Sequence, residues 1–156
     1  MTSEPLDLRE VFDRPWTGQA RVVRPWWLRW VPFVPTGFDF RTEVVPTEDG
    51  AIVHDTQTFP DGRVWERTMH GRITGPGRWQ MTADDMPGGA EIVVGPDGYA
   101  FAYTIWAPVL GPLRLPLRCT DEVRFDSADS LTDTIVFRFL GLHVGTLTMR
   151  LRRTAD

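Results

Sequence analysis

The chain has 156 residues, an apolar fraction of 42% and a formal net charge of -4. This length fits one domain with a real hydrophobic core, so we predict a single domain over residues 1–156. The acidic balance argues against a nucleic-acid partner, because phosphate binding requires a basic surface. Every basic residue is arginine, which excludes a lysine Schiff base and a P-loop lysine.

The N-terminal stretch "MTSEPLDLRE" has neither the basic region nor the apolar region of a signal peptide. No apolar run approaches the roughly 18 residues that span a bilayer. We therefore expect a cytoplasmic protein. One short helix is predicted over Leu6 to Phe12, with Ser3 as a loose cap and Pro5 in its first turn.

The next segment, "RPWWLRWVPFVP" at 24–35, contains three tryptophans and three prolines. Each proline removes a backbone donor and restricts the residue before it, so a central strand is not expected here. An irregular loop would leave Trp26, Trp27, Trp30 and Phe33 as an exposed apolar patch unless they pack on something. The candidates are one end of the fold, a partner subunit and, ranked third, a membrane surface.

The rest of the chain alternates short runs of period two with turns rich in Gly, Pro and Asp. Short links between consecutive strands require antiparallel neighbours, and a long sheet of this kind closes or splits in two. We predict an all-β fold, an antiparallel up-and-down β-barrel of eight to ten strands, with a sandwich as the alternative. The runs are 17–24, 38–45, 51–59, 63–71, 77–83, 89–95, 99–106, 113–125, 131–139 and 144–153.

Strand alternation places bulky side chains together on one face of several runs. Such faces either fill a solid core or line a cavity. If they line a cavity, we expect its ligand-contacting residues to be Phe38, Phe40, Trp65, Met69, Trp79, Met81, Phe101 and Phe137.

Two charges interrupt these apolar faces, Arg67 and Asp133. A buried charge is costly unless it has a partner of opposite charge or contacts water. Arg67 and Asp133 could therefore form an ion pair, point outward because a β-bulge shifts the strand register, or anchor a ligand. Tyr103 shares the Phe101 face and is a further candidate for polarising a carbonyl or moving a proton. Glu122 is another, although Asp121 and Glu122 are adjacent and only one of them can face inward.

Other polar residues carry weaker signals. Asp84 and Asp85 precede a Pro-Gly-Gly turn, where Asp normally caps the backbone; the alternative is a general acid or base at a barrel mouth. The single cysteine, Cys119, reads as a packed and inert thiol. The three histidines lack metal-ligand spacing, with His143 the best candidate if the protein binds haem. We expect no cofactor and no metal.

The runs "FPDGRVWER", "GRWQMTADDMPGGAEI", "YAFAYTI", "RCTDEV" and "FLGLHVGTLTMRLRR" occur in an order that resembles a family of bacterial lipocalin-like proteins of unknown function. The resemblance covers roughly Phe38 to Arg153 and implies a calycin-type closed barrel with a central ligand site. It supplies no catalytic residues. The chain departs from the family in the residues after Asp121-Glu122, in lacking an export signal, and in the aromatic segment that replaces a short polar hairpin.

Two functions follow as expectations. The first is binding of a hydrophobic small molecule of lipid, polyketide or terpenoid type, with Arg67 binding a carboxylate or enolate and residues 26–33 covering the barrel mouth. The second is a cofactor-free cyclase or isomerase on the same scaffold, using Arg67, Asp133, Tyr103 or Glu122. A porphyrin binder that uses a histidine is the third. We expect a monomer or a homodimer.

Overall fold

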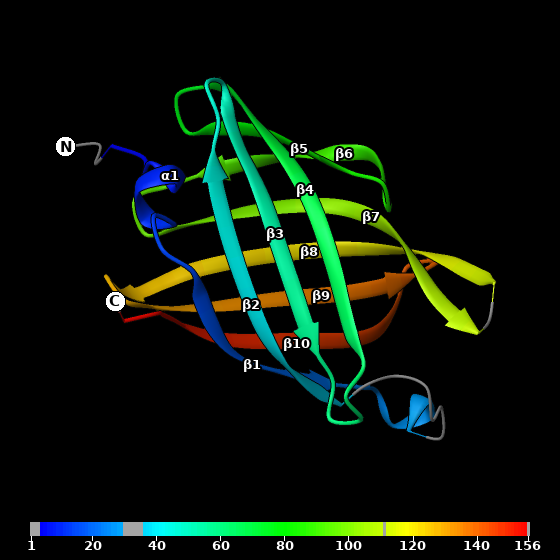
Figure 1. Ribbon diagram of the computed structural model, residues 1–156. Coiled ribbons are helices and arrows are strands. Elements are labelled where there is room, and N and C mark those ends of the chain that lie inside the picture. The colour runs from blue at the N-terminus through cyan, green and yellow to red at the C-terminus, as the bar shows by residue number, and fades with distance from the viewer. Residues whose placement is uncertain (1–3, 30–35, 111, 156) are drawn as a thin grey trace.

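The computed structural model describes residues 4–29, 36–110 and 112–155, and among these the side chains of 108–110 are left aside. Ten strands close into one barrel (Figure 1). They are β1 (Trp16–Val23), β2 (Gly37–Pro46), β3 (Gly50–Thr58), β4 (Val64–Gly75), β5 (Arg78–Ala83), β6 (Met86–Val94), β7 (Gly98–Leu110), β8 (Leu113–Ser127), β9 (Ser130–Phe139) and β10 (Leu142–Arg153).

Each strand pairs antiparallel with its neighbour in sequence, and β1 also pairs with β10, which closes the barrel. The prediction of an up-and-down barrel is confirmed, and the sandwich is not formed. Alternation explains why the strands form as they do. On β10, Leu147, Met149 and Leu151 are buried, while the alternate residues Arg150 and Arg152 are exposed.

The N-terminal helix is shorter than predicted. α1 spans Leu8–Val11, and its N-cap is Asp7, whose carboxylate accepts a hydrogen bond from the backbone N–H of Arg9 at 3.0 Å. The predicted start at Leu6 is therefore wrong, and Ser3 lies outside the described residues. Within the part of the chain that is described, no helix is long and apolar enough to cross a membrane.

α1 covers one end of the barrel (Figure 1). Leu8 and Phe12 are both buried there. The Phe12 ring contacts the rings of Trp16, Tyr99 and Phe125, with centroids 5.7, 6.5 and 6.2 Å away. Edge and tilted ring contacts of this kind add to the stabilisation from burial alone. The aromatic cluster therefore plugs this end, which we call the closed end.

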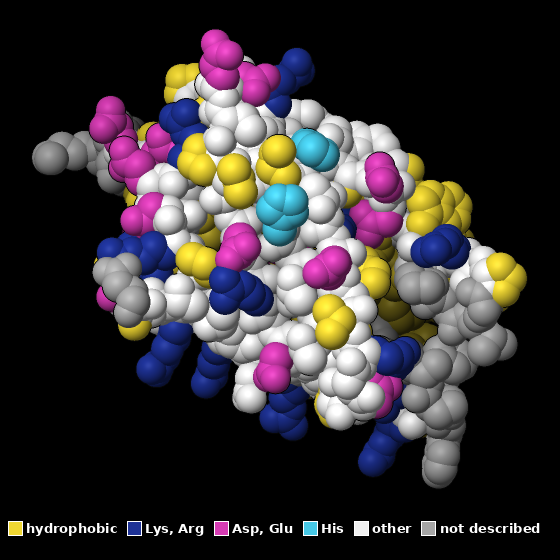
Figure 2. All heavy atoms as spheres, in the orientation of Figure 1, with side chains coloured by type: hydrophobic (Ala, Val, Ile, Leu, Met, Phe, Trp, Pro, Cys, Tyr) yellow, Lys and Arg dark blue, Asp and Glu magenta, His cyan; other side chains and the backbone are white. Residues whose placement is uncertain are grey.

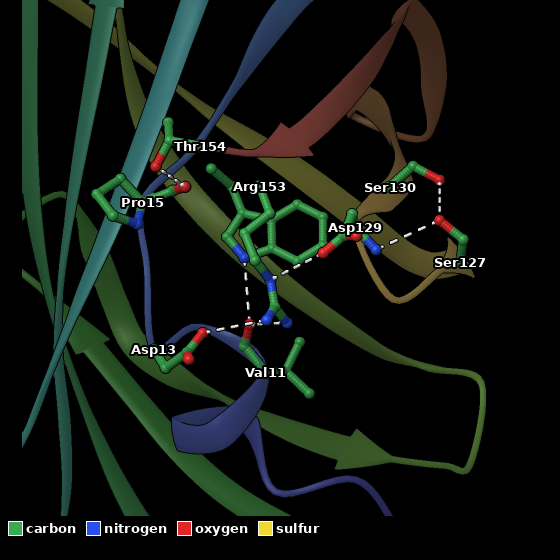
Figure 3. A network of polar contacts seen from close by, with 9 residues as sticks. Val11, Asp13, Pro15, Ser127, Asp129, Ser130, Arg153 and Thr154 are labelled. Atoms are coloured by element: carbon green, nitrogen blue, oxygen red, sulfur yellow. Dashed lines mark hydrogen bonds and ion pairs between the residues drawn. The ribbon is translucent and has the colours of Figure 1, made fainter. Parts of the chain in front are cut away.

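A polar network ties the two chain termini together at the closed end (Figure 3). Arg153, the last residue of β10, donates to the Val11 carbonyl at 3.1 Å and forms ion pairs with Asp13 and Asp129 at 3.4 and 3.6 Å. Its guanidinium lies 5.5 Å from the centroid of the Trp16 ring. The Trp16 indole N–H also donates to the Val11 carbonyl, at 3.2 Å. The plug is thus held by polar as well as apolar contacts.

The segment "DDMPGG" does not form the simple break that the sequence predicted. β6 already begins at Met86, and the register between β5 and β6 shifts between Met81 and Ala83. Gly88 and Gly89 have φ angles of 78° and 64°, a left-handed conformation that glycine adopts without strain. The resulting irregularity lies beside Asp85, at the end of the barrel opposite α1.

Candidate functional site

A cavity of about 190 Å³ lies inside the barrel. Its walls come from the inward faces of β2 to β10, and Leu8 and Phe12 form its floor at the closed end. At the other end, which we call the open end, the β5–β6 turn and the first residues of β4 border it. Figure 2 shows this opening at the right of the molecule, with hydrophobic side chains deep inside it.

Most of the residues predicted to contact a ligand do line this cavity. The aromatic ones are Phe38, Phe40, Trp65, Trp79, Phe101 and Phe137. Met69 and Met81 line it as well, and so do Arg67, Tyr103 and Asp133. Strand alternation was sufficient to place these side chains inside, because none of their strands has a bulge between the residues concerned.

Two of the residues assigned to an aromatic lid do not line the cavity. Trp26 and Trp27 form a short 3-10 helix, η1 (Trp26–Leu28), and their side chains are 77% and 45% exposed. The expectation that they contact a ligand in the cavity is therefore wrong. Trp30 and Phe33 lie outside the described residues. Pro25 indicated correctly that the described residues 24–29 leave the sheet, but a proline carries no information about where the chain then packs.

Glu122 also lies outside the cavity. Its side chain is exposed, whereas its neighbour Asp121 is buried and lines the cavity. Adjacent strand residues point to opposite faces, so the inward position belongs to Asp121. The assignment of Glu122 as an acid or base inside the barrel is corrected to Asp121.

Arg67 lies at the open end, where it is paired. Its Nε and one terminal nitrogen both donate to Oδ1 of Asp85, at 3.0 and 2.8 Å. Both side chains are mostly buried, and the guanidinium carbon lies 5.9 Å from the centroid of the Tyr103 ring. Arg67 is thus part of a partly buried ion pair whose partner is Asp85 and not Asp133. This also gives Asp85 a role beyond capping its turn.

Asp133 instead faces a second carboxyl group, that of Asp121. The two strands pair Asp121 with Ile135 and Val123 with Asp133, so the carboxyls are diagonal neighbours on the inner face. The Tyr103 hydroxyl donates to Oδ2 of Asp121 at 3.4 Å. The rings of Tyr103 and Phe101 stack 4.9 Å apart, which holds the phenol over the carboxyl pair.

Burial dominates the titration of this pair. Loss of water raises the pKa of Asp121 well above its usual range, and the negative charge of Asp133 raises it further. Burial also raises the pKa of Asp133 to about 6, while the hydrogen bond with Asp121 opposes that rise. The upward shift of the pKa is therefore larger for Asp121 than for Asp133. Two like charges this close cannot both ionise easily, so the pair titrates as one coupled unit.

The sequence analysis missed a third acidic group, Asp55. It lies on the inward face of β3 and lines the cavity, together with Ala51, Val53 and Gln57. Burial raises its pKa to about 6, opposed by a hydrogen bond with Thr42 and by the positive charge of Arg67. The alternation of side chains along "AIVHDTQTF" could have predicted that Asp55 points inward, because it places Asp55 on the same face as Ala51 and Val53.

The histidines and the cysteine take no part in the cavity. His54, His70 and His143 are all exposed on the outer surface. His143 bonds to the Thr146 hydroxyl at 2.9 Å, outside the cavity. Cys119 is fully buried, and burial raises its pKa to about 12, which keeps the thiol protonated. Among the described residues, no group of His, Cys, Asp and Glu is arranged to hold a metal ion.

Comparison with known proteins shows the fold. The sequence matches no family model and no curated protein. Two solved structures resemble the barrel. A protein of unknown function from the DUF3598 family of Nostoc punctiforme is 19% identical, with a TM-score of 0.64 over 98% of this chain and 51% of that one. Rv2717c from M. tuberculosis is 13% identical, with a TM-score of 0.59 over 96% of this chain and all of the other.

This chain therefore spans about half the length of the Nostoc protein and the whole of the mycobacterial one. At such identities the likeness extends to the ten-stranded antiparallel barrel and not to any residue of the cavity.

Proposed function

We propose that the protein binds a small and mostly apolar molecule, of lipid, polyketide or terpenoid type, in the central cavity. One observation carries the proposal: an internal cavity with apolar and aromatic walls on which a few polar groups converge. Sites for small molecules have this composition. An interior designed only for stability would be packed to near crystal density, with few voids larger than a water molecule.

The size of the cavity limits the ligand. A cavity of about 150 Å³ accommodates benzene, and this one, at about 190 Å³, is somewhat larger. A compact ring system fits that volume better than an extended acyl chain does. Because the closed end is plugged by aromatic rings, such a ligand enters from the open end, past the Arg67–Asp85 ion pair.

The proposal is tested by filling the cavity. Met69→Trp adds bulk to an inward face of β4, whereas Glu66→Trp adds the same bulk to its outer face. Toluene, camphor and palmitate are titrated into the wild type and both variants, with binding followed by NMR shifts of cavity methyl groups. We expect the two ring compounds to bind the wild type and Glu66→Trp, and to lose at least about tenfold in affinity in Met69→Trp. Equal binding to all three proteins would rule the cavity out.

The alternative function, a cofactor-free isomerase or cyclase, is favoured by the carboxyl pair. Environments that push the pKa values of neighbouring groups apart separate an acid from a base. Burial and the neighbouring charge raise the pKa of Asp121 well above its usual range, while Asp133, with a pKa of about 6, is largely ionised near neutral pH. An acid and a base facing one apolar cavity suit enol chemistry, in which Asp121 donates to a carbonyl oxygen and Asp133 takes a proton from the adjacent carbon.

A simple assay distinguishes catalysis from binding. Conversion of cyclohex-3-enone to cyclohex-2-enone moves one proton from the carbon between the carbonyl and the alkene to the far alkene carbon. Its product absorbs in the ultraviolet. If the alternative is right, Asp133→Asn loses on the order of 100-fold or more in turnover, while Glu122→Gln keeps the wild-type rate. A rate equal to buffer for the wild type leaves binding as the function.

A further inference from the structure

Three carboxyl groups converge on the cavity from opposite walls of the barrel. Asp121 and Asp133 project from neighbouring strands, β8 and β9. Asp55 projects from β3. In the closed strand order, β3 and β8 are separated by β4 to β7 on one side and by β9, β10, β1 and β2 on the other. With four strands between them in each direction, Asp55 faces Asp121 across the cavity.

Apart from the hydrogen bond that Asp121 and Asp133 share, the carboxyl pair has few of the partners that buried carboxyl groups normally have. The side chains of Asp121 and Asp133 are buried, at 4% and 8% exposure. Within the described residues, no donor contacts Oδ1 of either one. The Tyr103 hydroxyl, at 3.4 Å from Oδ2 of Asp121, is a weak contact. Buried polar atoms without partners are rare in native proteins, and they call for a missing donor.

No positively charged side chain among the described residues of the cavity wall donates a hydrogen bond to this carboxyl pair. Among the described residues that line the cavity, Arg67 is the one cation, and both of its bonded nitrogens are engaged by Asp85. Arg67 faces Asp55 directly across the β3–β4 ladder, yet its guanidinium turns to the open end. The cavity therefore contains an excess of acidic groups over basic ones, in apolar surroundings where charges interact strongly.

This charge distribution discriminates between ligand chemistries. An anionic ligand, such as a fatty acid, would bring a like charge toward three carboxyl groups. A hydrocarbon would leave Oδ1 of Asp121 and of Asp133 without donors. An ammonium group supplies three N–H donors and a positive charge, and its apolar substituent fills the rest of the cavity.

We infer that Asp121 and Asp133 form the binding site for the ammonium group of a compact apolar amine, and that Asp55 on the opposite wall adds negative charge to the cavity. This rests on the proposed binding function and names the chemical class of its ligand. Arg67 is then not the ligand anchor that the sequence suggested. It is a wall residue at the open end, neutralised by Asp85.

The pKa directions support this assignment at neutral pH. Asp55 and Asp133, each with a pKa of about 6, are largely ionised, and burial raises the pKa of Asp121 well above its usual range. Below about pH 6 both ionised groups take up protons and the negative charge is lost, so amine affinity falls. The other titratable groups that face the pair are Arg67 on β4, Asp85 before β6, Tyr99 and Tyr103 on β7, and Cys119 on β8.

Four molecules with the same ring test the inference: benzylamine, benzyl alcohol, toluene and benzoate. Calorimetric titration of the wild type near neutral pH should show benzylamine binding at least about tenfold tighter than toluene, with benzyl alcohol between them and benzoate weakest. At about pH 5 the benzylamine advantage should shrink by about tenfold, although the amine itself stays protonated, while toluene binding stays the same.

Two variants locate the effect. Asp121→Asn and Asp133→Asn should each lose about tenfold or more in benzylamine affinity and keep their affinity for toluene, which also shows that the cavity is intact. Glu122→Gln, on the outer face beside Asp121, should change neither. Toluene binding as tightly as benzylamine would overturn the amine assignment and leave the cavity proposal standing. Failure of all four molecules to bind would overturn both.

Discussion

At the closed end of the barrel, aromatic rings pack on one another, whereas at the open end tryptophans face solvent and charged groups line the wall. Trp16 is fully buried, contacts Phe12 and Phe125, and lies under Arg153. At the open end, Trp65 is 39% exposed although it lines the cavity. The same residue type therefore serves as a plug at one end and as part of a wall at the other.

The two ends of the barrel therefore have different roles: the closed end stabilises the fold, and the rest of the interior contains the candidate binding site. At the closed end the Trp16 indole N–H and one terminal nitrogen of Arg153 both donate to the Val11 carbonyl, although Nε of Arg153 has no hydrogen-bond acceptor among the described residues. Beyond this plug, the interior contains a void and an acidic pair without full hydrogen bonding, and one ion pair lies at the rim of the open end. Sites that bind ligands are commonly destabilised relative to the rest of a fold. Substitutions at the two ends should thus have opposite consequences.

The largest effect is expected at the closed end. Trp16→Ala removes a buried indole and leaves a cavity under Arg153, so it should lower the free energy of unfolding by about 3–5 kcal/mol. Trp65→Ala, which removes a ring already in contact with solvent, should cost less than about 1 kcal/mol. Urea unfolding followed by circular dichroism measures both. Similar losses for the two variants would contradict the separation of the two ends.

The second prediction is a substitution that stabilises the protein. The pKa of Asp133 is about 6 in the folded protein and near 3.8 in the unfolded chain, so the folded state binds the proton more tightly. The contribution to stability is therefore greatest below about pH 4 and is lost as the pH rises through about 6. Asp133→Asn mimics the protonated group. It should raise the free energy of unfolding by about 2 kcal/mol near pH 8 and by little near pH 4.

Denaturant titrations at the two pH values test this prediction. Glu122→Gln serves as the control, because it removes a carboxylate from the outer face of the neighbouring strand. A stabilisation that is the same at both pH values would indicate improved packing and not relief of a buried charge. A loss of stability near pH 8 would show that the ionised carboxylate is better satisfied than the contacts of Asp133 indicate.

The fold was predictable from the sequence because its signals are local. Alternating faces and turn residues are encoded within runs of about ten residues, and short links leave consecutive strands little choice but to pair. The inward positions of Trp79, Met81 and Tyr103 followed from the same alternation. The helix boundary was less certain, because Asp7 and Ser3 are both acceptable caps and only tertiary contact selects between them.

The candidate site was predictable only in part, because its pairings are not local. Alternation places Arg67 and Asp133 inside, but it does not say which groups face them. Asp85 reaches Arg67 only through the turn and the glycine irregularity that precede β6. Asp55 meets Asp121 only because the barrel closes after ten strands, which the sequence bounded at eight to ten. One strand fewer would have rotated Asp55 away from that wall.

The third prediction concerns the ion pair at the rim of the open end. A double-mutant cycle with Arg67→Met and Asp85→Asn should give a coupling free energy of about 1–2 kcal/mol, because both side chains are mostly buried. The matched control is the Arg78–Glu91 pair on the outer surface, whose two side chains are more than half exposed. Its coupling should be below about 0.5 kcal/mol. Equal couplings would indicate that the rim is as well hydrated as the outer surface.

The smallest effect is expected for the exposed tryptophans of η1. Because Trp26 is 77% exposed and does not line the cavity, Trp26→Ser should change the free energy of unfolding by less than about 0.5 kcal/mol. It should also leave the affinity for toluene unchanged, whereas Met69→Trp should lower it by at least about tenfold. Both quantities come from the urea and NMR titrations described above. A tenfold loss of toluene affinity in Trp26→Ser would show that η1 closes over the open end when a ligand is bound, and the contrast between a plugged end and an unplugged end would then hold for the empty barrel alone.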